Sequence, residues 1–138
     1  MFGDQNADSV TIAPREALVQ RSNGNTQIGY GIMASYFVPD TKGQSLRQAT
    51  DDLIHHLSAS NAGMQADDSG RTLKVNGNPA LITTLASKSA LTGGPETDAL
   101  LTINRPDGLF YLVFIAPASE FKDLEGVYND VVQSVRFK

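Results

Sequence analysis

Residues 98–116 read DALLTINRPDGLFYLVFIA, and this stretch decides the fold class. Two runs of β-forming residues, 98–104 and 109–116, flank the sequence RPDG, in which Pro106 and Gly108 stand where a tight turn needs them. The second run is almost wholly apolar, which predicts a central strand covered on both faces. Strands joined by so short a turn pair antiparallel.

More strands are predicted upstream of this hairpin. Residues 72–75 lead into Asn76-Gly77, the strongest short hairpin signal, and residues 80–87 follow it. Pro79 suits only a strand start or a sheet edge. Residues 28–38 form a longer β-rich run, and 9–13 and 16–20 are short β-like segments. The sequence therefore predicts a four-strand meander preceded by further strands.

Two helices complete the pattern. Residues 44–60 carry an apolar stripe at helical spacing, formed by Leu46, Ala49, Leu53, Ile54 and Leu57. Ser45 followed by Gln48 has the spacing of a capping box. Residues 121–135 carry a second stripe, for which Ser119 or Asp123 is the expected N-cap.

These elements predict an α+β fold, with a central antiparallel β-sheet and helices packed on its faces. The chain of 138 residues has the length of one domain. We expect residues 1–8 to be a flexible lead-in and 9–138 to form this single domain.

Composition excludes several classes of protein. The net charge is −4 and the eleven Lys and Arg residues are scattered, so no nucleic-acid partner is expected. No apolar run approaches the roughly 20 residues needed to cross a bilayer, so membrane insertion is not expected either. The first residues lack the basic and apolar regions of a signal peptide. There is no cysteine, which rules out disulfides and thiolate metal sites.

The run 29–34, GYGIMA, matches the G-x-G-x-x-A pattern of dinucleotide-binding proteins. That site needs a helix directly after the glycines, because the helix N-terminus holds the pyrophosphate. Here strand-forming residues follow, and then Pro39. We interpret Gly29 and Gly31 as glycines within a strand, which allow a bulge or close packing under a helix.

Neither a catalytic nor a metal-binding constellation is predicted. His55 and His56 are the only histidines, and adjacent helical residues point about 100° apart, so they cannot share a zinc ion. Asp51 and Asp52 stand four residues before them, a spacing typical of solvated ion pairs. No serine lies in a G-x-S-x-G elbow. No cofactor is expected.

Glu96 and Asp98 flank Thr97 at a strand start, so their side chains share one face of the sheet. Paired carboxylates can perform acid–base chemistry or bind a cation. More often such a pair keeps the end of a strand soluble, and we favour this interpretation.

Several segments together resemble one known domain: SVTIAP (9–14), GYGIMASYFVP (29–39), SLRQATDDLIHHL (45–57), LKVNGNPAL (73–81), ETDALLTINRPDGLFYLVFIAP (96–117) and VVQSVRF (131–137). This is the C-terminal accessory domain of soluble bacterial zinc metallopeptidases of the CAAX-prenyl-protease/HtpX type. The resemblance implies a PsbP-like fold, in which an antiparallel sheet lies between helices. The family's zinc ligands lie upstream, in its catalytic domain, and none is matched here.

The run around Ser89, Glu96 and Asp98 resembles the most recognisable polar run of that family, and together with Arg105 it gives the candidate ligand- or partner-binding residues. The first hypothesis is a non-catalytic accessory domain that follows a zinc metallopeptidase domain and binds a protein partner or that parent's own catalytic domain. The alternative is a free-standing PsbP-like binding module that docks on a larger protein assembly. A third is an enzyme whose Glu96, Asp98 and Arg105 converge in a cleft. The resemblance alone favours an extracytoplasmic location, in the periplasm or secreted.

Overall fold

The stretch 98–116 forms the two central strands of the fold. The structure is a computed structural model that describes residues 2–3, 10–13, 15–20, 26–28, 30–39, 43–60, 63–66, 70–88, 93–106 and 108–135. Strands β9 (Pro95–Arg105) and β10 (Gly108–Pro117) pair antiparallel from Arg105↔Gly108 to Glu96↔Pro117. Every described residue of β10 from Tyr111 to Pro117 is buried, which confirms the predicted central strand.

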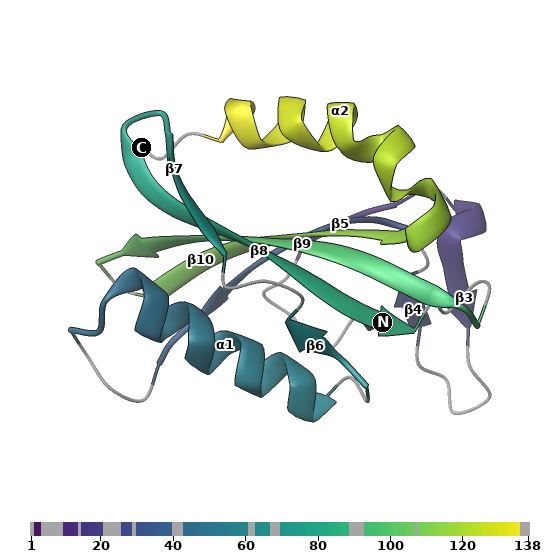
Figure 1. Cartoon of the computed structure of the whole chain (residues 1–138), viewed down its shortest axis with the longest axis horizontal. Coiled ribbons are helices and arrows are strands. Elements are labelled where there is room, and N and C mark those ends of the chain that lie inside the picture. The colour runs from purple at the N-terminus through teal and green to yellow at the C-terminus, as the bar shows by residue number, and fades with distance from the viewer. Residues whose placement is uncertain are drawn as a thin grey trace.

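The other strands extend this hairpin on both sides into a seven-stranded antiparallel sheet (Figure 1). Its order is β2-β5-β10-β9-β8-β6, and β7 also pairs with β8. The added strands are β2 (Val10–Ile12), β5 (Gly31–Phe37), β6 (Gln65–Ala66), β7 (Arg71–Val75) and β8 (Asn78–Lys88). The meander β7-β8-β9-β10 is confirmed.

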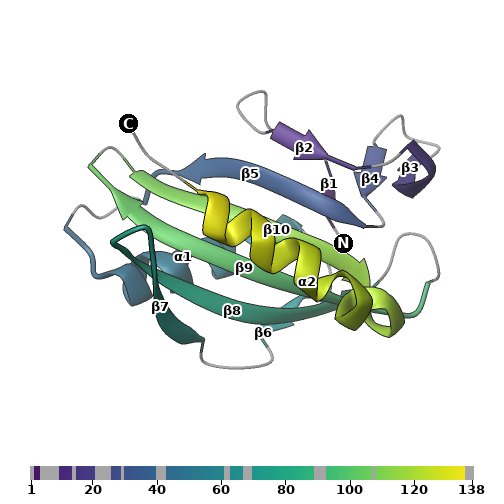
Figure 2. The same ribbon diagram turned by 90° about the horizontal axis from the view of Figure 1, so that it is seen from above.

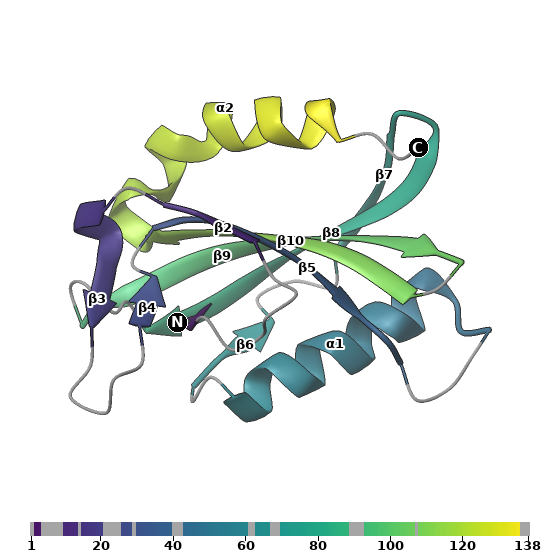
Figure 3. The same ribbon diagram turned by 180° about the vertical axis from the view of Figure 1, so that it is seen from behind.

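Two helices lie on opposite faces of the sheet, α1 (Leu46–Ser60) on one and α2 (Ala118–Ser134) on the other (Figures 1 and 3). A second, three-stranded sheet has the order β1-β4-β3 and lies at the end of the main sheet from which α2 starts. Its strands are β1 (Phe2–Gly3), β3 (Leu18–Gln20) and β4 (Thr26–Ile28), with a 3-10 turn, η1, at Arg15–Ala17. The observed class is the α+β class that the sequence predicts.

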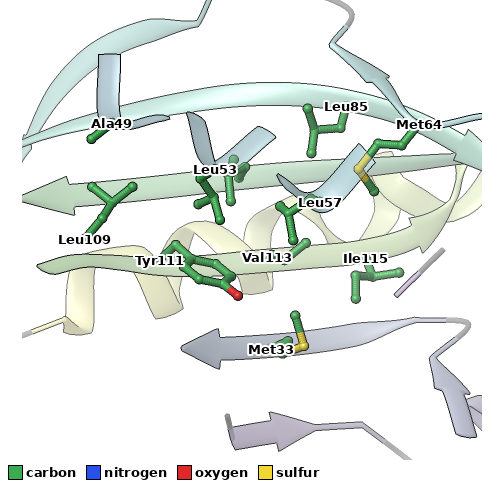
Figure 4. Close-up of a cluster of buried hydrophobic side chains, with 11 residues drawn as sticks. Met33, Ala49, Leu53, Leu57, Met64, Leu85, Leu109, Tyr111, Val113 and Ile115 are labelled. Carbon is green, nitrogen blue, oxygen red and sulfur yellow. The ribbon is translucent and has the colours of Figure 1, made fainter. Parts of the chain in front are cut away.

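Each face of the main sheet carries its own core. The cluster under α1 joins Leu53 and Leu57 of the predicted helical stripe to Leu85 and Val113 of the sheet (Figure 4). The cluster under α2 joins Tyr128 and Val132 to side chains from β5, β7, β8, β9 and β10. Burial of apolar area at roughly 25 cal/mol per Å² makes these two layers the main stabilising force of the fold.

Polar contacts fix α1 in place. Ser45 and Gln48 exchange hydrogen bonds of 3.2 Å between side chain and backbone, which is the predicted capping box. In the second turn of the helix the hydroxyl of Thr50 lies 2.7 Å from that of Thr102 on β9, and both residues are fully buried. The Thr102 hydroxyl also donates to the carbonyl of Leu81 at 3.3 Å.

Helix α2 is fixed at its middle and at its C-terminal end. The hydroxyl of Tyr128 donates to the carbonyl of Ile115 at 2.8 Å, and burial raises the pKa of Tyr128 to about 12. Asn76, in the β7–β8 turn, donates from its side-chain amide to the carbonyls of Gln133 and Val135. These two carbonyls are among those that the end of a helix leaves without an intrahelical donor.

The predicted N-caps of α2 are wrong. The N-cap is Pro117, with φ −52° and ψ 141°, and no side chain caps the helix there. Strand β10 ends at Pro117 and the helix begins at Ala118, so Ser119 and Asp123 lie inside the helix and not at its N-cap position.

The N-terminal third differs from the sequence prediction in detail. Phe2–Gly3 belongs to the segment expected to be a flexible lead-in, but it pairs with Gln27 and Ile28 of β4, which offers an open strand edge. The rest of residues 1–8 lies outside the described residues. The segment 16–20, expected as strand, is split between η1 and β3. The run 28–38 is likewise split between β4 and β5.

Gly31 explains the dinucleotide-like glycine pattern. Its φ is 146°, and a Cβ there would lie 2.7 Å from the carbonyl oxygen of Ile12 and 2.8 Å from the Cβ of Ala13. Only glycine tolerates this close approach. The expected close packing is confirmed, but the neighbour is the end of β2 and not a helix. Gly31 is followed by the rest of strand β5, and no helix starts there.

Candidate functional site

The most unusual polar feature in the described residues is a buried carboxyl pair. Glu96 and Asp98 stand two residues apart on β9 and share the α1 face of the sheet with Leu100. Only 1% of Glu96 and 0% of Asp98 is exposed. In the sheet register Asp98 lies between Leu85 and Ile115, two core residues labelled in Figure 4. The interpretation that this pair keeps a strand end soluble is therefore wrong, because both side chains are buried although β9 starts at the exposed Pro95.

Burial dominates the electrostatics of this pair. Desolvation and the charge of neighbouring Glu96 together raise the pKa of Asp98 to about 9. Desolvation also raises the pKa of Glu96. No described N–H or hydroxyl group reaches the carboxyl oxygens of Asp98. Two adjacent buried carboxyls favour a state in which the pair keeps a proton at neutral pH.

This geometry limits what the carboxyl pair can do. A substrate in solvent does not reach side chains that are 0–1% exposed. Cation binding by carboxylates needs several oxygen ligands around one point. Within the described part of the chain, no three His, Cys, Asp or Glu side chains gather in that way.

The other predicted site residues do not join the pair. Arg105 lies at the opposite end of the 11-residue strand β9 from Glu96, and at about 3.3 Å per residue the two are separated by roughly 30 Å. The cleft of Glu96, Asp98 and Arg105 is therefore not formed. Ser89 lies outside the described residues. Binding by these residues stays a prediction.

The predicted histidines lie on the surface. His55 and His56 are both exposed on α1, and the His56 ring lies 5.5 Å from that of Phe37. Among the helices of the described residues, none is both long and apolar enough to cross a membrane.

A second feature is an exposed apolar surface on the α2 side of the sheet. Val10 and Ile12 of β2 are 62% and 65% exposed, and they pair with Ala34 and Ile32 of β5. Directly opposed residues of antiparallel strands point to the same face, and Ile32 and Ala34 belong to the α2-side cluster. Val10 and Ile12 therefore also point to the α2 side. Figure 2 shows β5 and β2 running beside α2; Ile32 near the start of β5 is buried in the cluster under the helix, and β2 lies outside it.

Tyr36 of β5 continues this surface. It is 48% exposed, and its ring stands edge-on to Phe110 at a centroid distance of 5.5 Å. Phe110 belongs to the periphery of the α2-side cluster. The aromatic pair thus extends the apolar surface along β5 toward its C-terminal end.

Val127 of α2 forms the other border. It is 58% exposed. Burial raises the pKa of Tyr30, the residue directly before β5, and the charges of Glu16 and Glu120 act on it in the same direction. Glu120 and Val127 are two helical turns apart and so share one side of α2, the side toward β5. We call Val10, Ile12, Ala34, Tyr36 and Val127 the β2–β5 surface.

Sequence reasoning placed these residues in predicted strands and, for Val127, in the apolar stripe of the second helix. The available signal was the width of the apolar pattern in α2, where Val127 adds to a stripe that Tyr128 and Val131 already fill. An apolar residue beyond those needed to cover the sheet can be recognised as part of an exposed surface only when the position of the sheet under the helix is known.

No protein-family model and no curated protein sequence matches this chain. Its structure is similar to that of PA94, a protein of unknown function from Pseudomonas aeruginosa, with a TM-score of 0.67 and 9% identity over 99% of this chain and 86% of that one. It is also similar to cyanobacterial PsbP (CyanoP) from Synechocystis sp. PCC 6803, with a TM-score of 0.60 and 6% identity over 97% of this chain and 84% of that one. At such low identity the likeness shows the fold alone: this chain has a PsbP-like α+β fold.

Proposed function

We propose that this chain is a non-catalytic binding module that docks on another protein or domain. The observation that carries the proposal is the β2–β5 surface, where Val10, Ile12, Tyr36 and Val127 are each about half exposed or more. Contiguous exposed apolar side chains on a folded protein mark interaction sites. The buried position of Glu96 and Asp98 supports a structural role for the carboxyl pair.

The finer form of the proposal is an accessory domain C-terminal to a zinc metallopeptidase catalytic domain. The ordered sequence resemblance over most of the chain supports it, and the PsbP-like fold agrees with it. The alternative is a free-standing PsbP-like module on a larger assembly. The native reading frame upstream of Met1 separates them: an in-frame H-E-x-x-H helix supports the first, and a signal peptide directly ahead supports the second.

Selection from a random peptide library tests the binding function. Peptides are selected on the wild-type chain and counter-selected on the double variant Ile12→Gln, Val127→Gln, which removes apolar area without changing charge. The exposed His55→Gln, on the opposite face of the sheet, is the control and should bind the selected peptides as the wild type does. The proposal fails when no selected peptide distinguishes wild type from the double variant.

An activity screen tests the non-catalytic part. Peptidase, esterase and phosphatase substrates are incubated with the chain, with and without zinc, and no turnover is expected. Reproducible turnover that co-purifies with the chain and disappears in Asp98→Asn would assign catalysis to the carboxyl pair instead.

A further inference from the structure

The β2–β5 surface has the width of one more helix. Adjacent strands lie about 4.8 Å apart and a helix is about 10 Å across, so one helix covers about two strands. Helix α2 packs on β10 and β9, and β5 and β2 remain beside it (Figure 2). A helix lying over β5 and β2 would contact Val127 on one side, Val10 and Ile12 on the other, and Ala34 beneath.

The border of this surface along α2 is acidic. Three acidic residues lie at helical spacings from Val127: Glu120 seven residues before it, Asp123 four before it and Asp130 three after it. All three therefore share its side of the helix. All three are exposed. Lys122, the basic residue of α2, is five residues before Val127 and therefore lies on the opposite side. A helix docked here meets three carboxylates along one edge.

From this apolar floor and acidic border we infer that the occupant is an amphipathic helix of a partner protein or domain, apolar on one face and carrying Lys or Arg along the edge that faces α2. This inference rests on the proposed binding function and adds the chemistry of the ligand. A second copy of this chain fits poorly, because packing α2 against α2 would bring the two acidic borders together. An anionic lipid surface is disfavoured for the same reason.

Two synthetic helical peptides of about 18 residues test the inference, a length at which an isolated helix can form. Both have Leu along one face and Ala elsewhere; one carries Lys along both edges, and the other carries Glu at the same positions. Amide chemical shifts of the isotope-labelled chain are followed during titration at low salt. The Lys peptide should shift amides of β2, β5 and residues 120–131 of α2, and the Glu peptide should bind at least about tenfold more weakly.

Charge reversal supplies the decisive comparison. In the triple variant Glu120→Lys, Asp123→Lys, Asp130→Lys, the preference should invert so that the Glu peptide binds more tightly. The matched control is Asp51→Lys, Asp52→Lys, Glu125→Lys, which changes the net charge equally at exposed sites outside the border and should keep the wild-type preference. All six positions are exposed, and thermal melting checks the fold of each variant.

The outcomes separate this inference from the proposed function. Equal binding of both peptides at the β2–β5 surface would overturn the basic-helix inference while a binding module remains. Shifts along the outer edge of β2 alone would mean that an extended strand is added there, and would also overturn it. Peptides from the library that need Ile12 and Val127 but lack basic residues would do the same. Binding of the Lys peptide to anionic vesicles only, and never to the chain, counts against it as well.

Discussion

At the scale of single residues, burial matters more than residue type in this protein. Asp98 is a carboxyl group with no exposed area, and its pKa is raised to about 9 by desolvation and by Glu96. Its unfolded-state pKa is close to 3.8. At a pH between these two pKa values, the Asp98 carboxyl is ionised in the unfolded chain and protonated in the folded chain. Folding then takes up a proton, so the contribution of Asp98 to stability falls as pH rises from about 4 toward 9.

Replacing Asp98 with Asn should therefore stabilise the protein above neutral pH. The amide keeps the shape of the protonated acid and does not ionise. The variant therefore avoids the fall in the free energy of unfolding that the wild type undergoes as pH rises, which is at most about 1.4 kcal/mol per pH unit. At pH 8, about four pH units above the unfolded-state pKa, this slope allows a gain of up to about 6 kcal/mol in the free energy of unfolding. Urea unfolding at several pH values measures it. Asp51→Asn, at an exposed site on α1, is the control, and a loss of stability in Asp98→Asn at pH 8 would contradict the assignment of a protonated pair.

The hydroxyl pair of Thr50 and Thr102 gives a second prediction. Thr102→Val leaves the fully buried Thr50 hydroxyl without its 2.7 Å partner, which should cost about 1–3 kcal/mol. Thr50→Val together with Thr102→Val removes both polar groups and should cost less than the sum of the single changes. A double-mutant cycle from chemical unfolding measures the coupling. Additive losses would show that the two hydroxyls do not depend on each other.

At the scale of elements, the turn between β7 and β8 also holds the end of α2. Asn76 has φ 49° and Gly77 φ 84°, the left-handed conformations that an Asn-Gly hairpin turn requires. The same Asn76 side chain donates to the carbonyls of Gln133 and Val135. One residue thus closes a hairpin and caps a helix from far along the chain.

Asn76→Asp separates these two roles. Asp suits the same turn, but its carboxylate cannot donate to helix carbonyls and is repelled by the negative end of the helix dipole. We expect a loss of about 1–2 kcal/mol and faster hydrogen exchange of the last turn of α2, with the β7–β8 amides unchanged. Asn76→Gly keeps the turn and removes the donor without adding charge, so it should cost less. Equal exchange in the wild type and both variants would rule out the cap.

At the scale of the whole molecule, stability is concentrated where both faces of the sheet are covered. β9 and β10 lie between the two hydrophobic clusters, and Leu100, Leu101, Leu112 and Val113 are at most 5% exposed. β2 lies at one edge of the sheet, is three residues long, and is exposed at each of them. The surface proposed for binding therefore includes a strand that is poorly protected from solvent.

This difference predicts the pattern of native-state hydrogen exchange. Backbone amides of β9 and β10 should exchange only through global unfolding, and amides of β2 should exchange by local opening at a far lower free energy. Two-dimensional NMR spectra recorded over days in deuterated buffer measure both. Adding the Lys peptide described above should slow exchange in β2 and leave β9 unchanged. Equal protection of β2 and β9 without peptide would contradict this picture.

Sequence by itself determined the local features of this protein, because they depend on neighbours along the chain. The period of apolar residues predicts α1 and α2, and a continuous apolar run predicts β10. The capping box of Ser45 and Gln48 is as expected, and the Asn76-Gly77 turn and the antiparallel meander follow from turn chemistry. The α+β class is a consequence of these parts.

Only the tertiary structure decided which groups are buried and which remain exposed. Glu96 and Asp98 are charged residues near the start of a strand, which usually face solvent. Here they are buried, and both neighbouring strands, β8 and β10, pair with this part of β9. Ile12 lies in a segment predicted as strand and Val127 in the apolar stripe of a predicted helix, and both are exposed because α2 lies over β9 and β10 and leaves β2 uncovered. Burial depends on contacts between residues distant in sequence, which local pattern does not encode.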